Sequence, residues 1–422
     1  GLAVAAQVHV VGAGLAGLSC AVRLAGAGRR VGVYEAAGHA GGRCRSFHDE
    51  ALGRTIDNGN HLLLSGNRSA LDYLREIGAA DSLTGPEPAA FPFLDLKTGH
   101  RWTVRPGSGW FPWWIFDTCR RVPETTPGDY LRGLALAWAG PRSTVAQCLV
   151  PGTALYRRFW EPLCVAVLNT AAEEAAAALL WPVLKKTFGR GEAACRPLIA
   201  RHGLGQGFVD PALRFLEARG TSVSFNRRLR ALNLDGDRVS ALEFGGAPLS
   251  VGPEDSVVLA VPPAASADLC PDLVAPRQSR AIVNGHFRLD RTAPDVTFLG
   301  LVGGTCQWLF VRGDIASVTA SAADALAEEP AAAIAERMWP EVVGALNLGA
   351  PPLPAHRIVK EKRATFAQIP EEAARRPGVR TTWRNVFLAG DWTDTGLPAT
   401  IEGSVCSGRK AADMVLSSRG GT

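Results

Sequence analysis

The sequence predicts an α/β protein in which a discontinuous parallel-sheet domain is interrupted by an inserted α+β domain. Three observations favour this fold class. A strand, a glycine-rich turn, a helix and a second strand open the chain, which is the pattern of a βαβ unit. Further α/β patterns follow near residues 220–263, as short strands, and near 385–416, as a strand, a loop and a terminal helix. The stretches between them, 81–199 and 266–354, are instead rich in tryptophan, proline and alanine-based helix patterns.

Length supports this division, because 422 residues exceed the ~100–200 residues of a usual domain. We assign residues 1–80, 200–265 and 355–422 to the discontinuous domain, and residues 81–199 and 266–354 to the inserted domain. The three parts of the first domain must then meet in space.

The elements are expected in the following order. Residues 8–11 are a continuous apolar run that is typical of a buried parallel strand, and a helix over 15–27 and a strand over 30–34 complete the first unit. Short strands are expected at 222–225, 229–234, 239–244 and 256–261, a helix at 330–339, a strand at 385–389 and a terminal helix at 399–416.

Composition excludes several classes of protein. The net charge of +5 is the small difference between 45 basic and 40 acidic residues, so we expect no nucleic-acid partner. Nine cysteines without a C-x-x-C pair indicate neither a disulfide framework nor a metal site, and they favour a reducing cytoplasm. No window of ~18 uncharged apolar residues and no signal peptide is seen, so no membrane-spanning segment is expected.

The opening turn carries the pattern G-x-G-x-x-G at residues 12–17. Its first glycine makes a tight turn, the second lets the backbone approach a pyrophosphate, and the third allows close packing of helix and strand. Glu35 ends the second strand, where a carboxylate can bind ribose hydroxyls. We therefore predict a dinucleotide site that includes Gly12, Gly14, Leu15, Ala16, Gly17 and Glu35.

A second glycine pair follows at Gly41-Gly42, with Arg43 and Arg45 directly after it. A guanidinium suits a pyrophosphate because it offers a fork of donors. With these residues the sequence resembles the glutathione-reductase-like flavoproteins, and within them the amine oxidases, protoporphyrinogen oxidases and carotenoid desaturases. The resemblance implies a Rossmann domain that binds FAD non-covalently, and we expect further cofactor contacts from Gly42, Arg43, Arg45, Asn58, Gly59 and Leu229.

The third match lies near the C-terminus, where a strand ends in Gly390-Asp391 and a helix starts near Thr400. In such flavoproteins Gly-Asp holds the ribityl and pyrophosphate end, and the helix N-terminus favours negative charge at the flavin. We add Gly390, Asp391, Thr400 and Ile401 to the cofactor contacts, and we expect Glu402 to make a structural contact.

The branch of the superfamily is indicated by three segments. Residues 57–63, residues 159–163 with Asn169-Thr170, and residues 390–393 with 397–403 are similar to squalene-associated FAD-dependent desaturases, the hydroxysqualene dehydroxylases. An aromatic amine cage is not supported, since the chain has four tyrosines and Leu397-Pro398 in the loop. The resemblance covers nearly the whole chain.

This resemblance implies a bacterial enzyme in which hydroxysqualene loses its hydroxyl group and receives hydride from reduced FAD, giving squalene for hopanoid synthesis. A long isoprenoid substrate, coupling to squalene-pathway synthases and a cyclase are implied as well, whereas the external electron donor is not indicated. A carotenoid- or phytoene-type desaturase is the alternative, and a non-catalytic lipid-binding protein, as in the Rab GDP-dissociation inhibitors, is a second one.

Loss of the hydroxyl group requires a proton donor and exclusion of water. His61 is the leading candidate because its segment resembles the loop next to the flavin, although it could simply satisfy backbone groups. Asp57, Glu161 and Asp394 are alternatives if an apolar pocket raises their pKa, and a bound water without a dedicated acid is a further one.

An aromatic segment precedes Arg120 and Arg121, and includes Trp110, Phe111, Trp113, Trp114 and Phe116. Aromatic and basic residues together suit a membrane interface, from which a hydrocarbon substrate would be drawn. We expect a cytoplasmic protein in peripheral contact with the membrane, with a tunnel wall or plain core as the alternative roles of these rings. Trp160, Leu397 and Pro398 are further expected substrate contacts.

Overall fold

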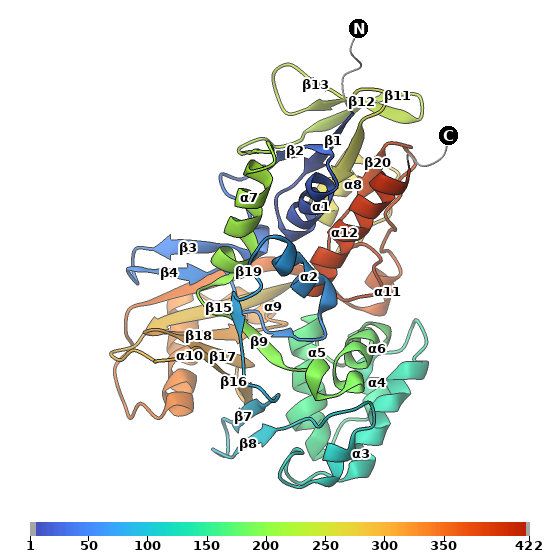
Figure 1. Cartoon of the computed structure of the whole chain (residues 1–422). Coiled ribbons are helices and arrows are strands. Elements are labelled where there is room, and N and C mark those ends of the chain that lie inside the picture. Colours follow the sequence, from blue (N-terminus) through green and yellow to red (C-terminus); the bar gives the residue numbers. More distant parts are fainter. Residues whose placement is uncertain (1–5, 419–422) are drawn as a thin grey trace.

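The computed structural model describes residues 6–418 of the chain. Its first domain contains a five-stranded parallel sheet in the order β10-β2-β1-β14-β20 (Figure 1). The strands are β1 Gln7–Val11, β2 Arg30–Tyr34, β10 Val223–Ser224, β14 Ser256–Leu259 and β20 Val386–Leu388. The predicted fold class is confirmed, because three segments that are far apart in the sequence meet in this one sheet.

Helices pack on this sheet and on one another. The first-domain helices are α1 Leu15–Gly26, α2 Arg68–Glu76, α7 Asp210–Glu217, α8 Pro263–Leu269 and α12 Ile401–Ser417. Ten of the twelve residues of α1 are buried, because it lies between the sheet, α7 and α12. Helices α1 and α12 approach closely where Gly408 faces Ser19, so the two ends of the chain form one core.

Smaller sheets complete the first domain. Strands β11 Ala231–Asp235, β12 Arg238–Glu243 and β13 Leu249–Ser250 form an antiparallel sheet at one end of the molecule. Strands β3 Ser46–Asp49 and β4 Arg54–Asp57 form a hairpin. Strand β9 Pro197–Ala200 pairs with β5 Leu63–Leu64 and β6 Leu83–Thr84. Short turns of helix at η1 Gly42–Cys44 and η7 Gly205–Val209 lie in this domain.

The second domain is built on a seven-stranded sheet in the order β19-β15-β18-β17-β16-β7-β8. Its strands are β7 Phe91–Asp95, β8 Arg101–Val104, β15 Ser279–Arg288, β16 Thr297–Val302, β17 Trp308–Arg312, β18 Ile315–Ala320 and β19 His356–Phe366. Helices α9 Asp324–Ala327 and α10 Ala331–Leu346 pack against it, and α11 Pro370–Ala373 follows β19. The predicted boundary at residue 355 needs correction, because β19 pairs with β15 and so belongs to this sheet.

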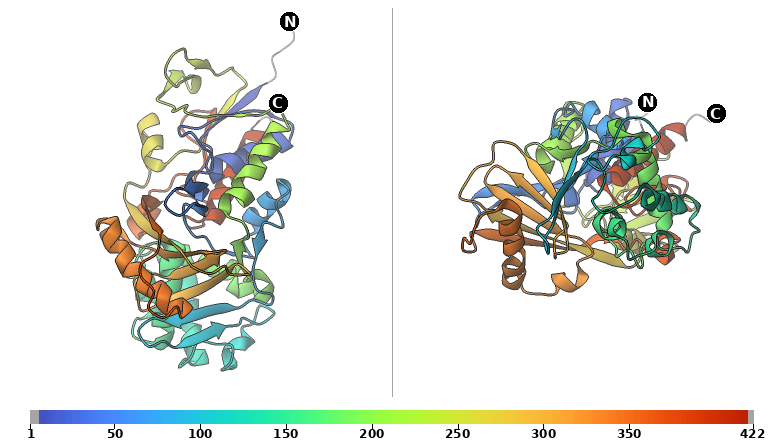
Figure 2. Two further views of the ribbon diagram at one scale, coloured as in Figure 1. Left: turned by 90° about the vertical axis from the view of Figure 1, so that its left-hand side faces the viewer. Right: turned by 90° about the horizontal axis from the view of Figure 1, so that it is seen from below.

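A helical part of the second domain lies at the end of the molecule far from β11–β13, as both Figure 1 and Figure 2 show. It contains α3 Pro127–Leu131, α4 Val145–Leu149, α5 Glu161–Leu168 and α6 Ala177–Lys186. Short turns connect these helices, namely η2 Trp113–Phe116, η3 Arg132–Trp138, η4 Tyr156–Trp160, η5 Phe188–Arg190 and η6 Glu192–Ala194. No helix within residues 6–418 is both long enough and apolar enough to cross a bilayer.

The contact between α1 and α12 yields a test of the fold. A Cβ atom on Gly408 would lie 2.1 Å from Ser19 Oγ and 2.2 Å from the carbonyl oxygen of Ala16, so the helices would have to separate. Such overpacking costs about 1–3 kcal/mol. We expect Gly408→Ala to lower the thermal unfolding temperature. The control is Gly344→Ala in α10, where the new Cβ meets nothing within 4 Å and alanine favours the helix. Equal unfolding temperatures for the two variants would contradict the packing described.

Candidate functional site

One large cavity, with a volume of about 1380 Å³, is lined by residues of both domains. Its walls come from the carboxyl ends of the parallel strands, the start of α12, the seven-stranded sheet, and helices α5 and α6. A typical small-molecule site is ~300–1,000 Å³. The cavity therefore has room for a cofactor and a substrate together.

The glycine turn after β1 forms one end of the cavity. A Cβ atom on Gly12 would lie 2.1 Å from the carbonyl oxygen of Ala260, and one on Gly17 would lie 1.8 Å from the carbonyl oxygen of Gly12. A Cβ atom on Gly14 would meet nothing, because Gly14 borders the open cavity at the start of α1. Tight packing behind the turn and open space before it fit a dinucleotide pyrophosphate at a helix N-terminus.

Glu35 connects this turn to the end of β2. Its two carboxylate oxygens accept hydrogen bonds from the backbone N–H groups of Ala13, at 2.9 Å, and Ala37, at 2.6 Å. The carboxylate also borders the cavity. It is therefore held in place and retains free lone pairs that can accept from ribose hydroxyls.

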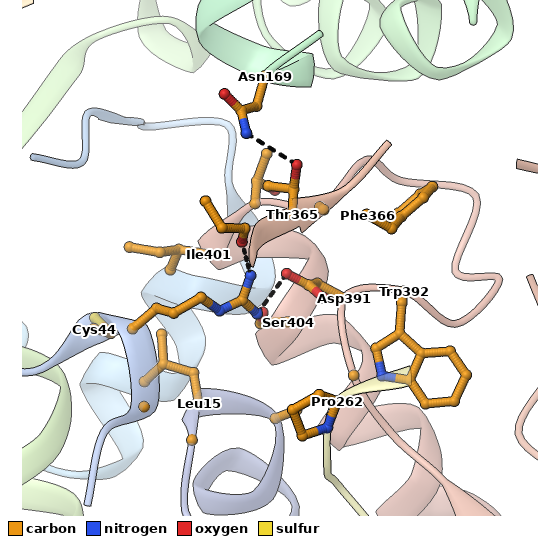
Figure 3. Close-up of a pocket in the computed structure, with 18 of the residues that line it drawn as sticks. Leu15, Cys44, Asn169, Pro262, Thr365, Phe366, Asp391, Trp392, Ile401 and Ser404 are labelled. Carbon is orange, nitrogen blue, oxygen red and sulfur yellow. Dashed lines mark hydrogen bonds and ion pairs between the residues drawn. The ribbon is translucent and has the colours of Figure 1, made fainter. Parts of the chain in front are cut away.

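Asp391 and Arg43 form an ion pair across the cavity. Arg43 Nη2 lies 2.7 Å from Asp391 Oδ2, and the same guanidinium donates to the carbonyl of Ala364. The Asp391 carboxylate raises the pKa of Arg43, so the guanidinium stays charged. Figure 3 shows Asp391 between Ile401 and Trp392 at this wall. The pair joins η1, β19 and the loop after β20 around the cavity.

Helix α12 starts at the cavity wall. Thr400 caps it, because its hydroxyl accepts from the N–H of Gly403 at 3.1 Å. Glu402 accepts from the N–H groups of Ala70 and Ser69, so this carboxylate caps the start of α2. Burial raises the pKa of Glu402. Its contact is structural, but it stabilises α2 rather than its own helix.

The cavity gathers most of the predicted cofactor contacts. Those that line it are Gly12, Gly14, Leu15, Ala16, Glu35, Gly42, Arg43, Asn58, Gly59, Leu229, Gly390, Asp391, Thr400 and Ile401. Gly17 lies behind the turn, where its role is in packing. The predicted cofactor contact of Arg45 needs correction, because its guanidinium lies outside the cavity. It lies against the His39 ring and 4.8 Å from the centre of the Phe47 ring.

Three of the four candidate acids lie outside the cavity and need correction. Asp57 is buried, but its carboxylate accepts from Ser46 Oγ and the N–H of Leu204 and pairs with Arg312 at 3.3 Å. Glu161 starts α5 and does not line the cavity, although burial raises its pKa. Asp394 is exposed and accepts from the N–H of Gly396.

His61 is the candidate acid that does line the cavity. Burial lowers its pKa to about 4, and the positive charge of Arg43 adds to this effect although Asp57 opposes it. At neutral pH the ring is therefore uncharged. It carries no imidazolium proton in this state, which weakens its case as the acid.

A polar network in the cavity was missed by sequence reasoning. Asn284 on β15 and Thr319 on β18 are partners in register, and they join Asn60 and Asn58 through hydrogen bonds. The side chain of Asn58 lies 3.4 Å from the carboxylate of Glu361 on β19. All of these residues line the cavity. The available signal was the presence of polar residues in otherwise apolar strands, but only the pairing of β15 with β18 shows where they face.

The remaining wall is mostly apolar. Its rings are Phe91, Phe93, Phe159, Phe188, Trp308 and Phe310, and the predicted contacts Leu397 and Pro398 lie here as well. Trp160 is buried behind Phe159 and does not reach the cavity, so its predicted substrate contact is corrected. The described residues offer no group of three His, Cys, Asp or Glu side chains that could hold a metal ion.

The predicted aromatic segment also lies outside the cavity, so it is no tunnel wall. Trp110 is 80% exposed, Trp113 69% and Phe116 56%, whereas Trp114 is buried. The rings of Phe111 and Trp113 pack against each other with their planes inclined. Exposed rings of this size on one segment indicate an interaction surface rather than core.

Comparisons with known proteins agree with this geometry. Residues 15–416 match the family described as flavin containing amine oxidoreductase. Proteins named hydroxysqualene dehydroxylase from Rhodopseudomonas palustris and Sinorhizobium fredii are 49% and 48% identical, over 97% of this chain and 98% of each relative. A phytoene desaturase from an Oncidium hybrid is 24% identical over 97% of this chain and 78% of its own. The solved structure of cyclohexylamine oxidase from Brevibacterium oxydans shares the fold, with a TM-score of 0.66, 16% identity and coverage of 98% and 99% of the two chains.

The histidines of this region predict how stability depends on pH. Burial lowers the pKa of both His61 and His286 to about 4. Because an unfolded histidine titrates near 6.5, the unfolded chain binds more protons between pH 4 and 6.5, and stability rises with pH across this window. A change from pH 7 to pH 5 should cost about 2 kcal/mol for each residue.

Urea unfolding at both pH values measures this effect. His286→Gln should reduce the loss by about 2 kcal/mol. His202→Gln, at an exposed position, is the matched control and should leave the loss unchanged. The same pH dependence in all three proteins would show that the buried ring of His286 is not held neutral in the folded protein.

Proposed function

Because the chain belongs to the flavin-containing amine oxidoreductases, and within them to the hydroxysqualene dehydroxylases, we propose that it binds FAD non-covalently and reduces hydroxysqualene to squalene. Identity of 49% over nearly the full chain is the observation that carries this function. The cavity supports it, since a dinucleotide cradle at one end adjoins a mostly apolar space.

The reaction breaks a C–O bond, and the oxygen leaves with the electron pair and takes up a proton to form water. When bound, the reduced flavin supplies the hydride that forms the new C–H bond. The protein positions the reactants and excludes water from them. The residues that would hold the cofactor are the turn at Gly12–Gly17, Glu35 and the Arg43–Asp391 pair. The apolar rings keep water from the carbon that becomes cationic.

The two alternatives fit less well. A phytoene-type desaturase would remove hydride in the opposite direction, but the identity to such an enzyme is only 24%. A non-catalytic lipid-binding protein would not need the cofactor end of the cavity. The close packing of Gly12 and Gly17 and the buried Asp391 preserve that end.

A direct test is anaerobic incubation of the photoreduced, FAD-loaded protein with hydroxysqualene, followed by hydrocarbon analysis. We expect squalene to form, and denaturation should release yellow FAD into the supernatant. The control is the oxidised protein, which should give no squalene. Desaturation of phytoene under oxidising conditions, without squalene formation under reducing ones, would overturn the proposal. A protein that stays colourless after FAD is added would favour the binding protein instead.

We further propose that the protein collects its substrate from an anionic bilayer through an aromatic tip. The tip consists of Trp110, Phe111, Trp113, Phe116, Leu131, Leu134 and Trp138, all of them exposed. Helix α3 joins its two halves, because it contacts both η2 and η3. Helix η3 in turn packs on α6, whose Val183 and Lys186 line the cavity. The tip thus lies on the outer side of the cavity wall that α6 forms.

Charge favours lipid as the partner of this tip. Residues 101–160 contain eight arginines and three carboxylates, a surplus of five charges that equals the formal net charge of the whole chain. Arg105, Arg120 and Arg132 are among the exposed ones. Each basic residue near an anionic membrane contributes about 1 kcal/mol, and tryptophan prefers the interface. A cytoplasmic membrane face rich in anionic lipid meets both requirements.

Sedimentation with lipid vesicles tests the tip. The wild type should bind phosphatidylglycerol vesicles, and the triple variant Trp110→Ser/Trp113→Ser/Trp138→Ser should lose at least roughly tenfold in affinity because three interfacial anchors are gone. Leu234→Ser, which removes an exposed apolar side chain at the opposite end, is the control. Binding of the triple variant at wild-type strength, or equal binding to neutral phosphatidylcholine vesicles, would contradict this role.

A further inference from the structure

We propose that Asn60, Thr319 and Asn284, the polar triad, bind the hydroxyl group of the substrate and select an alcohol over a hydrocarbon. This inference rests on the proposed function and names the residues that recognise its substrate. The three side chains line the cavity and form a chain of hydrogen bonds. Asn60 Nδ2 donates to Thr319 Oγ1 at 3.0 Å, and Thr319 Oγ1 donates to Asn284 Oδ1 at 2.7 Å.

Backbone carbonyls fix the orientation of both amides. Asn60 Nδ2 also donates to the carbonyl of Ser317 at 3.1 Å, so its nitrogen must face the sheet. Asn284 Nδ2 lies 3.4 Å from the carbonyl of Asn58, so its nitrogen is identified as well. Thr319 accepts from one amide and must therefore donate to the other. The direction of the whole chain of hydrogen bonds is thus determined.

Each end of the triad keeps one unused hydrogen-bonding position. Asn60 Oδ1 accepts no hydrogen bond within residues 6–418, so an acceptor is available there. Asn284 Nδ2 carries two hydrogens and has one partner, so a donor is available there. A hydroxyl group needs one acceptor for its proton and one donor for its oxygen. The triad supplies both, and a hydrocarbon could use neither.

Another asparagine of the cavity shows the contrast. Asn169 donates to the carbonyl of Arg280 and to Thr365 Oγ1, and its oxygen accepts from the N–H of Ala322. Figure 3 shows its side chain directed to Thr365. The Asn169 amide is thus engaged at both ends by the protein, which indicates a structural role. The triad differs from Asn169 in that its amides combine a fixed orientation with free hydrogen-bonding positions.

The surroundings give these free positions their effect on specificity. Asn284 is 1% exposed and Thr319 5%, and the aromatic rings Trp308 and Phe310 line the same cavity. A site that is built to hydrogen-bond a hydroxyl group discriminates against ligands that lack it, because its buried polar groups then stay unpaired. The alcohol substrate should therefore bind more tightly than the hydrocarbon product, which favours product release.

Ligand binding separates this role from turnover. Trp308 lines the cavity, so quenching of tryptophan fluorescence in detergent reports occupancy by hydroxysqualene or squalene. We expect the wild type to prefer hydroxysqualene by roughly tenfold. Thr319→Val and Asn284→Leu should reduce this preference to about twofold or less while squalene binds as before. Thr297→Val, an exposed position on β16, is the matched control and should keep the full preference.

Thermal unfolding temperatures show whether each variant is folded. If Thr319→Val or Asn284→Leu does not fold, Asn60→Ala, at a partly buried loop position, takes its place. A wild-type preference that persists in all folded triad variants would overturn this inference, even if the enzyme makes squalene. Failure of the wild type to form squalene would instead overturn the proposed function. A loss of preference together with a matching fall in kcat/KM for hydroxysqualene would support both.

Discussion

The parallel alignment of β2, β1, β14 and β20 is the constraint on which the site depends. Parallel neighbours place their carboxyl ends along one edge of a sheet, and this edge is where open α/β sheets bind ligands. The glycine turn follows β1, Glu35 follows β2, Ala260 follows β14 and Asp391 follows β20. Residues separated by hundreds of positions in the sequence thereby border one cavity.

Close contacts behind that edge keep the alignment rigid. Gly17 packs on the carbonyl of Gly12, and Gly12 on that of Ala260, so the turn, α1 and the end of β14 are held at fixed distances. Two charged groups of the cavity also have local partners, because Arg43 pairs with Asp391 and Glu402 accepts hydrogen bonds from the amides at the start of α2.

Sequence predicted the parts of this structure that are local. Contiguous sequence patterns predicted the βαβ unit, the terminal helix and most of the residues at the cofactor end of the cavity. Glycine turns and apolar runs each span only a few residues, so the sequence alone identifies them. Residues whose environment is set at long range were predicted poorly. Asp57 looked like a possible acid, but Arg312, from β17, pairs with its carboxylate. Likewise Asn284 acquires a role only through its register with Thr319, and β19 was assigned to the wrong domain because its partner strand lies far back in the chain.

The position of the aromatic tip also determines how an adsorbed molecule would stand. The tip belongs to the helical end of the protein, whereas β11–β13 and the parallel sheet lie toward the other end (Figures 1 and 2). A molecule held to lipid by this tip is upright, with its substrate domain at the bilayer and its cofactor domain in the aqueous phase. The substrate domain would then face the lipid phase, while the cofactor domain stays open to water.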